Sequence, residues 1–502
     1  MKSRTILLLA ALIICTLCML SPDCAADAIE SYKAGNRSLI SFSLDNPYLP
    51  LLALMGVVLA IASFYFPRFG LLVMLLFMLL ATDMPVGKSE GMERAVTIRI
   101  EDIVLLLVSG GWLLNRARTR SLGIVKFVPL YTPILAMSGV IILSTILGYF
   151  QDTVSINRGF FFAMKRLEYF WIFFMALNLM ETSREALNAL RILLFASVII
   201  TLIGTAQFFF FPVSELSQGG ATATAGFGRA NTMGDFLLMM VGIASGMIIY
   251  AETKRSYLLN ILLCIGFSVA LIMTKSRGAY VSIPPMIAMI FLLSRDTRII
   301  RIIIGGIVFV GLYMLLVNLD FGATSQLLAK HDMEISQQFT QIGDVATQGE
   351  KVDPSLHSRI LAWKESVDQI ISYPVLGQGS GSKKMGYADN QYVQELLESG
   401  IIGFCVFMYM NLCIFVYLFN IYRQTGRPIL RALCLGFMGG HTGMMVHGIT
   451  MTNFYTIFNM EVFWFLLAII CLLRYNEQRE YISEKETDGT NNNSPRTVSP
   501  AP

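Results

Sequence analysis

Residues 353–403 read DPSLHSRILAWKESVDQIISYPVLGQGSGSKKMGYADNQYVQELLESGIIG and end the long polar interruption of an otherwise apolar chain. Apolar residues recur at three- and four-residue spacing in the first half, which predicts an amphipathic helix from Pro354 to the stop at Pro374. A glycine-rich turn and a second short helix follow, and the second helix leads into an apolar run. The stretch is therefore expected to lie on a membrane surface or to fold over a helix bundle.

The composition of the whole chain supports a membrane setting. Hydrophobic residues make up 55% of the 502 residues and charged residues 14%, against about 25% charged in an ordinary soluble domain. The mean hydropathy is +0.62. These values exclude a soluble globule and predict an all-α, polytopic transmembrane helix bundle of about 12–14 spans. The net charge of +4 gives no indication of nucleic-acid binding.

The apolar runs divide the chain into five parts. Residues 1–28 are either a signal peptide or a first transmembrane helix, and both readings stay open. A transmembrane bundle is expected over 29–318, a large extracytoplasmic catalytic loop over 319–400, C-terminal transmembrane helices over 401–473 and a disordered cytoplasmic tail over 474–502. The spans are placed near 48–66, 69–83, 99–115, 127–149, 161–180, 190–212, 234–251, 258–273, 279–294, 302–318, 401–421, 432–449 and 457–473.

Basic loops indicate the orientation of the bundle, because cytoplasmic loops collect lysine and arginine. Counting spans places four such loops on one side, together with the C-terminus, and that side is expected to be the cytoplasm. The loops contain Arg116, Arg118, Arg120 and Lys126; Lys254 and Arg255; Arg295, Arg298 and Arg301; and Arg423, Arg427 and Arg431.

The cysteines and histidines indicate no metal site. The cysteines show no CxxC and no ligand spacing with histidine, so we interpret them as small buried side chains rather than ligands or disulfides. They are Cys15, Cys18, Cys24, Cys264, Cys405, Cys413, Cys434 and Cys471. His441 and His447 are interpreted as packing or hydrogen-bonded residues. No metal and no cofactor is expected.

Two short segments on the predicted outer side contain arginine against the usual bias. GFGRANTMG, 226–234, precedes a helix that Asn231 or Thr232 can cap, and TKSRGA, 274–279, is a tight turn that contains Lys275. Each has an ordinary interpretation as a capped helix or a solvated connector. Arg229 and Arg277, however, are planar donor forks at the expected headgroup level, which favours a diphosphate clamp.

The polar stretch and one span add further candidates. The glycine-rich turn is either a plain turn or an amide nest for an anion. Asp389 either caps the following helix or acts as a general base. Charge inside a span is costly, so Arg166 is either half of a structural Arg–Glu pair or a lipid-phosphate contact. The other polar candidates are Arg359, Lys364, Lys383, Asn390, Glu395 and Glu398.

Taken together and in this order, five segments resemble the O-antigen ligase and Wzy-type polysaccharide polymerase family. The resemblance implies a multi-pass glycosyltransferase whose donor is an undecaprenyl-diphosphate-linked glycan, without a bound metal, in the bacterial inner membrane. The segments are TIRIEDIVLLLVSGGWLL (97–114), GFGRANTMGDFLL (226–238), TKSRGAYVS (274–282), SRILAWKESVDQIISYPVLGQGSG (358–381) and DNQYVQELLESGIIG (389–403).

The resemblance implies that Arg229 and Arg277 hold the diphosphate and that Asp389 is the base, with Glu395 or Glu398 as weaker alternatives. Ligases of the family usually have histidine where this chain has Asp389, which favours a polymerase of exopolysaccharide, capsule or O-antigen repeat units. The alternatives are an O-antigen ligase that transfers glycan to lipid A-core and, from another class, a lipid-linked oligosaccharide flippase. Expected partners are the glycan donor and acceptor, membrane lipids, a chain-length regulator and a flippase. The substrate-binding candidates are Arg166, Asn231, Lys275, Arg359, Lys383, Asn390, Glu395 and Glu398.

Overall fold

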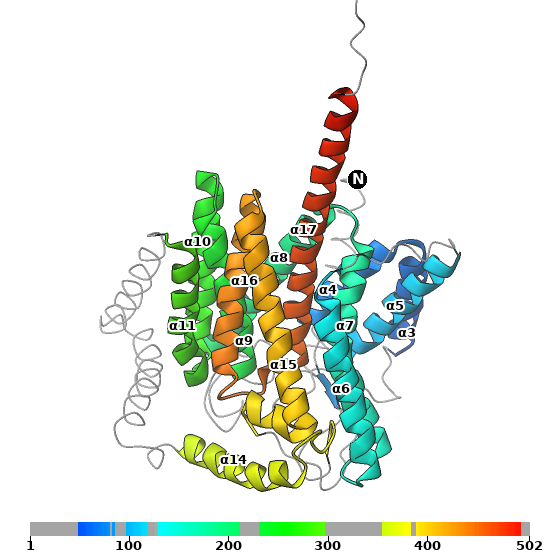
Figure 1. The fold of residues 1–502 in the computed structure, drawn as a ribbon, viewed down its shortest axis with the longest axis vertical. Helices are drawn as coiled ribbons and strands as arrows, with labels where there is room; N and C mark the ends of the chain where they lie inside the picture. Colours follow the sequence, from blue (N-terminus) through cyan, green and yellow to red (C-terminus); the bar gives the residue numbers. More distant parts are fainter. Residues whose placement is uncertain are drawn as a thin grey trace, which may run out of the picture. The chain divides into compact units, whose positions relative to one another are not determined.

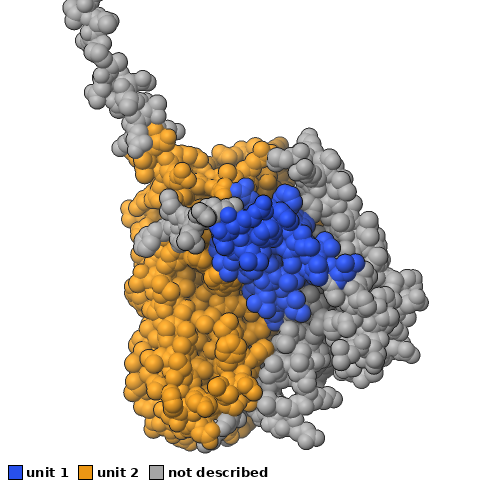
Figure 2. All heavy atoms as spheres, turned by 90° about the vertical axis from the view of Figure 1, so that its right-hand side faces the viewer, with its two compact units in different colours: residues 1–119, 209–221 blue, residues 120–208, 222–502 orange. Residues whose placement is uncertain are grey.

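The computed structural model describes residues 49–80, 83–85, 97–118, 126, 128–210, 230–296, 354–382 and 388–492. The predictions for 1–28, for the span at 302–318 and for the first part of the polar loop, 319–353, lie outside these residues. The chain divides into two compact units, residues 1–119 with 209–221 and residues 120–208 with 222–502 (Figure 2).

The described part of the first unit is three helices and a small ribbon. Helices α3 (Leu49–Tyr65), α4 (Pro67–Leu80) and α5 (Ile100–Arg118) pack on one another. Strands β1 (Asp83–Pro85) and β2 (Thr97–Arg99) pair antiparallel. Proline at the first position of α4 costs no hydrogen bond, because that N–H would have no partner within the helix. The ribbon was not expected from the sequence.

The second unit contains the longest apolar helices (Figure 1). Across the described residues, eight helices are long and apolar enough to cross a membrane: α6, α8–α11 and α15–α17. The predicted polytopic helical bundle is thereby confirmed. The elements of this unit are α6 (Tyr131–Phe150), α7 (Ile156–Leu179), α8 (Ser183–Phe210), α9 (Ala230–Ile249), α10 (Lys254–Met273), α11 (Arg277–Ser294), α14 (Pro354–Ser372), α15 (Gln391–Gln424), α16 (Pro428–His447), η2 (Asn453–Tyr455) and α17 (Ile457–Asn492).

Helices α9 and α16 cross through two pairs of glycines, each pair four residues apart. A Cβ on Gly242 would lie 2.6 Å from the carbonyl oxygen of Gly436, and one on Gly246 would lie 2.2 Å from that of Ala432. Gly440 lies against Met239 on the same face. Small residues at this spacing let two helix backbones approach closely inside a membrane, where packing rather than water drives association. This crossing is the core of the second unit.

We expect Gly436→Leu to destabilise the protein by about 3 kcal/mol, because a side chain there meets backbone that cannot rotate away. The measurement is the unfolding midpoint of purified protein in detergent. Gly266→Leu on α10 is the matched control, since a Cβ there meets nothing within 4 Å. Equal midpoints for the two variants would contradict the close crossing.

Helix α14 confirms the amphipathic helix predicted for the polar stretch, and it packs over the start of α15 (Figure 1). Trp363 and Ile370 pack against a small core that includes Leu397, and the Trp363 indole donates to the Ala388 carbonyl at 2.7 Å. Part of the predicted apolar face is not covered by the bundle: the Val367 side chain is 50% exposed. The helix therefore folds onto the bundle with one apolar edge left uncovered.

The glycine-rich turn closes a break in α15. Gly400 has φ 62° and ψ −165°, which interrupts the helix after Ser399. The amides of Gln378 and Gly379 donate to the carbonyls of Leu397 and Glu398, at 2.8 and 3.0 Å. These carbonyls would otherwise be left without helical partners. The two amides are thus used within the fold, which favours the plain-turn interpretation over an anion nest.

The C-terminal helix is longer than the predicted boundary at 473. Helix α17 continues to Asn492, so residues 474–492 of the predicted disordered tail are helical. The last ten residues, 493–502, lie outside the described residues. The polar extension contains good helix formers and an i,i+3 pair, Arg474–Glu477 at 2.8 Å. Glu477 also accepts from the hydroxyl of Thr425 at 2.6 Å. This pairing anchors the extension to the connection between α15 and α16.

Candidate functional site

The turn between α10 and α11 is built around Ser276. Lys275 has φ 55°, and Ser276 caps α11 by accepting the amide of Ala279 at 3.4 Å. Arg277, half-buried, is the first residue of α11. The predicted tight turn in front of a helix is confirmed, and this turn is where Arg277 enters the fold. Arg229 lies outside the described residues.

Asn231 connects this turn to α9. The expectation that Asn231 or Thr232 caps α9 is wrong, because both residues lie within the helix, which begins at Ala230. The side chain of Asn231 instead accepts a hydrogen bond from the Ser276 hydroxyl at 2.8 Å. An asparagine that looks like a cap in the sequence thus contacts the turn that contains Arg277.

A fully buried carboxylate lies close to this turn. Asp235 is 0% exposed and accepts from three side chains: His447 Nδ1 at 3.1 Å, Asn453 at 3.0 Å and Asn459 at 2.9 Å. His447 Nε2 lies 3.5 Å from the Ser276 hydroxyl. His447 is therefore hydrogen-bonded, as predicted. Asp235 is not among the candidates predicted from the sequence, although a carboxylate within an apolar span is a signal in itself.

Asp389 forms an ion pair with Arg359. The Arg359 Nε lies 3.8 Å from Asp389 Oδ2, and their side chains are 23% and 41% exposed. Asp389 has φ 45°, in the left-handed region that asparagine and aspartate tolerate best. The cap of α15 is Asn390, whose side chain accepts the amides of Tyr392 and Val393 at 2.9 and 3.1 Å. Asp389 is therefore not the cap, and its carboxylate is available for other contacts.

The turn that follows α16 contacts both the segment that contains Asp389 and the turn that contains Arg277. On one side the Gln391 amide donates to the Gly448 carbonyl at 2.7 Å. On the other side a Cβ on Gly278 would lie 2.2 Å from Thr450 Oγ1 and 2.8 Å from the His447 ring. Residues 447–450 thus join the start of α15, next to Asp389, to the first turn of α11, which contains Arg277. Lys383 lies outside the described residues.

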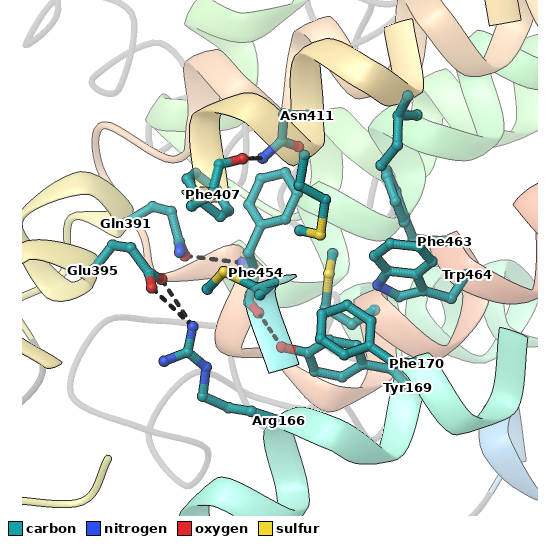
Figure 3. Close-up of a pocket in the computed structure, with 14 residues that line it drawn as sticks. Arg166, Tyr169, Phe170, Gln391, Glu395, Phe407, Asn411, Phe454, Phe463 and Trp464 are labelled. Atoms are coloured by element: carbon teal, nitrogen blue, oxygen red, sulfur yellow. Dashed lines mark hydrogen bonds and ion pairs between the residues drawn. The ribbon is translucent and has the colours of Figure 1, made fainter. Parts of the chain in front are cut away.

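The same unit contains a buried ion-pair cluster (Figure 3). Arg166 Nη2 lies 3.0 Å from both carboxylate oxygens of Glu395, and Nη1 lies 3.4 Å from Glu398 Oε2. The three side chains are 6%, 0% and 1% exposed. The Arg166 guanidinium also stacks over the Tyr455 ring, 4.4 Å from its centre. Arg166 is thus a buried partner of two carboxylates from α15.

The position of Arg166 favours the Arg–Glu interpretation, with partners distant in sequence. Its neighbour Lys165 pairs with Glu168 at 3.1 Å, whereas Arg166 pairs with Glu395 and Glu398. Burial raises the pKa of the Tyr455 phenol well above its usual range; Arg166 opposes this shift and Glu395 adds to it. The phenol therefore keeps its proton and donates to Glu395 Oε2 at 3.0 Å. Glu395 and Glu398 are held inside the bundle, which makes them poor candidates for a base.

Arg166 and Glu395 also line a small pocket whose other walls include many aromatic side chains (Figure 3). Tyr169 donates to the Phe454 carbonyl at 3.3 Å, and the Phe454 amide donates to Gln391 Oε1 at 3.0 Å.

The residues that the structure describes contain no group of three His, Cys, Asp or Glu side chains placed to hold a metal ion. Of the described cysteines, Cys264, Cys434 and Cys471 are buried as expected, whereas Cys405 is exposed.

Comparison with known proteins identifies the segment that contains these candidates. Residues 262–408 match the family model Wzy_C, described as O-antigen ligase. The matched segment includes Arg277, Arg359, Asp389 and Glu395, and the resemblance inferred from the sequence is confirmed. No curated protein matches the chain.

Proposed function

From the premise that this chain contains the O-antigen ligase domain and is a multi-pass membrane protein, we propose that it polymerises undecaprenyl-diphosphate-linked oligosaccharide repeat units. The product is a surface polysaccharide: exopolysaccharide, capsule or O-antigen. The observation that carries the proposal is that residues 447–450 join the Arg277 turn to the Asp389 segment. This connection supports a single site in which Arg277 is the cation for the leaving diphosphate and Asp389 is the carboxylate for the attacking hydroxyl.

The proposed reaction is a direct displacement at the anomeric carbon. The acceptor hydroxyl of a second lipid-linked unit forms the new C–O bond, and the bond to the diphosphate breaks with its electron pair on the departing oxygen. Arg277, together with Arg229, holds the diphosphate and stabilises its increasing charge without a bound metal. Asp389 takes the proton of the acceptor hydroxyl, and Arg359 orients the Asp389 carboxylate.

The distribution of arginines supports an extracytoplasmic site. Helix α10 begins at Lys254 and Arg255, and the connection between α15 and α16 contains Arg427. Arg277 lies beyond the opposite end of α10. Basic residues collect on the cytoplasmic side, so this distribution supports an orientation with the end of α17 in the cytoplasm and the Arg277 turn on the extracytoplasmic side. The proposed membrane is the bacterial inner membrane. A flippase that supplies the lipid-linked units and a chain-length regulator are the expected partners.

Purified protein in detergent, incubated with lipid-linked repeat units, tests this function. A polymerase extends the chains without a sealed membrane, whereas a flippase needs two separated compartments. Chain elongation in detergent is the expected result, and its absence from folded protein would overturn the proposal.

The second candidate, an O-antigen ligase, is favoured by the family model's own description. Asp389, at the position where ligases usually have histidine, favours the polymerase. An acceptor comparison separates the two: growth on the lipid carrier identifies a polymerase, and transfer to lipid A-core identifies a ligase.

Asp389→Asn is expected to lower the rate of elongation by about 100-fold or more, because the amide cannot accept the proton. Asparagine also tolerates the left-handed backbone at this position, so the fold is preserved and the loss reports on chemistry. The measurement is product length against time on an acrylamide gel. Asp368→Asn, an exposed carboxylate on α14, is the control. Near-normal elongation by Asp389→Asn would remove Asp389 as the base.

A further inference from the structure

The pair Asp235–His447 lies in the interior of the second unit and is held by several elements. Asp235 comes from α9, His447 from the end of α16, Asn453 from η2 and Asn459 from α17. Asp235 and His447 are each 0% exposed. Burial of a carboxylate is costly unless hydrogen bonds replace its water. Here three side-chain donors do so, which indicates an arrangement built around this carboxylate.

Asp235 determines which way the imidazole presents its second nitrogen. The carboxylate is an acceptor only, so it fixes a proton on His447 Nδ1 at 3.1 Å. The other nitrogen, Nε2, then faces the Ser276 hydroxyl at 3.5 Å. Carboxylate, imidazole and hydroxyl thus follow one another in a line that ends at the cap of α11.

The imidazole also lies directly against the first turn of α11. A Cβ on Gly278 would lie 2.8 Å from His447 Cδ2 and 3.0 Å from Nε2. The hydroxyl of Ser276 meanwhile donates to Asn231 at 2.8 Å and accepts from the Ala279 amide. His447 therefore contacts the residues immediately before and after Arg277, which fixes where α11 begins.

Neither His447 nor Ser276 is placed to touch a substrate. His447 is 0% exposed and Ser276 is 2% exposed. The Ser276 hydroxyl is already engaged with Asn231 and the helix amide, which argues against a nucleophile. The role that fits is to hold the turn rather than to react.

We propose that Asp235 and His447 are positioning residues that hold the Ser276–Arg277 turn in the geometry that binds the diphosphate of the lipid-linked donor. This inference rests on the proposed function, because Arg277 is the proposed diphosphate ligand. A small displacement of a binding group costs up to about 100-fold in rate, so the pair is expected to matter although it never meets the donor.

Two substitutions of His447 each keep one of its two contacts and remove the other. Asparagine places an amide near the position of Nδ1 and keeps the bond to Asp235, while glutamine reaches the position of Nε2 and keeps the contact with Ser276. We expect His447→Asn to weaken binding of undecaprenyl diphosphate by about tenfold or more, and His447→Gln to weaken it less. The measurement is the dissociation constant of undecaprenyl diphosphate with purified full-length protein in detergent, alongside the unfolding midpoint.

A double-mutant cycle with Arg277→Ala provides the deciding readout. If His447 acts through Arg277, His447→Asn adds no further loss of affinity in the Arg277→Ala background. Asp235→Asn is expected to behave in the same way as His447→Asn. An equal loss of affinity in both backgrounds, or a lowered midpoint with unchanged affinity, would overturn the inference. Wild-type affinity of Arg277→Ala itself would instead overturn the proposed diphosphate site, so the two failures are distinguishable.

Discussion

Arg277→Ala is expected to stop polymer growth, with a rate at least about 100-fold below that of the unchanged protein. Arg277 is the first residue of the capped helix α11, and in the proposed reaction its guanidinium stabilises the charge on the departing diphosphate. An interaction that strengthens as the bond breaks lowers the barrier, so its loss reduces kcat as well as kcat/KM. The measurement is initial elongation rate over a range of donor concentrations.

Two further variants identify what Arg277 contributes. Arg277→Lys keeps the charge but loses the planar fork, and an intermediate rate is expected. Arg255→Ala, an exposed arginine at the other end of α10, is the matched control and is expected to elongate normally. Full activity of Arg277→Ala would contradict its placement at the diphosphate.

Arg166→Met is expected to destabilise the protein by about 3–5 kcal/mol, because it leaves buried carboxylates without their cation. Arg166 pairs with Glu395 and Glu398, and the side chains of all three are at most 6% exposed. The unfolding midpoint in detergent measures the effect. The substitution is therefore expected to lower the unfolding midpoint itself, and this effect does not depend on an activity assay.

A second substitution tests whether the loss comes from unpaired charge. Adding Glu395→Gln to Arg166→Met removes one buried charge and is expected to restore part of the midpoint. Arg191→Met, which changes an exposed arginine of α8, is the control and should leave the midpoint unchanged. If the double variant were as unstable as Arg166→Met, packing around the guanidinium would account for the loss instead.

Features encoded in neighbouring residues were predictable from the sequence. The apolar runs predicted the membrane helices, and the spacing of Ile360, Trp363 and Ile370 predicted α14 with its stop before Pro374. The tight turn that contains Arg277 was also predicted, because two apolar runs leave no room for a longer connection. In each case the signal and the structure it predicts lie within a few residues of each other.

Contacts between distant segments could not be predicted in the same way. Arg166 pairs with a glutamate 229 residues away, and Asp235 meets a histidine 212 residues away. Each residue alone indicated only that a charge or a polar ring needs a partner inside the bundle. Which partner it finds depends on how the helices cross, and here the glycines of α9 and α16 bring Asp235 and His447 together.

The predicted positions of helix ends differ from the structure by a few residues at the caps and by more at the C-terminus. The sequence left open whether Asp389 caps α15, yet the cap is its neighbour Asn390. The sequence predicts Asn231 or Thr232 as the cap of α9, but both residues lie inside the helix. Serine, asparagine and aspartate are nearly equal as caps, so adjacent candidates cannot be ranked from the sequence alone. At the C-terminus, a polar tail without apolar periodicity predicts disorder, although charged residues with good helix propensity extend α17 beyond the membrane span.

The break at Gly400 also has a consequence for the order in which the protein assembles. The part of α15 after Gly400 is a continuous apolar helix that can enter a bilayer alone. The part before it depends on amides of residues 378–379, which in turn are held by the Thr153 hydroxyl on the Gln378 carbonyl at 2.7 Å. The ribosome makes Thr153 and residues 378–379 before α15, so these partners are already synthesised when α15 emerges. An insertion between 379 and 397 would separate the two partners, whereas the membrane helix that follows would still insert.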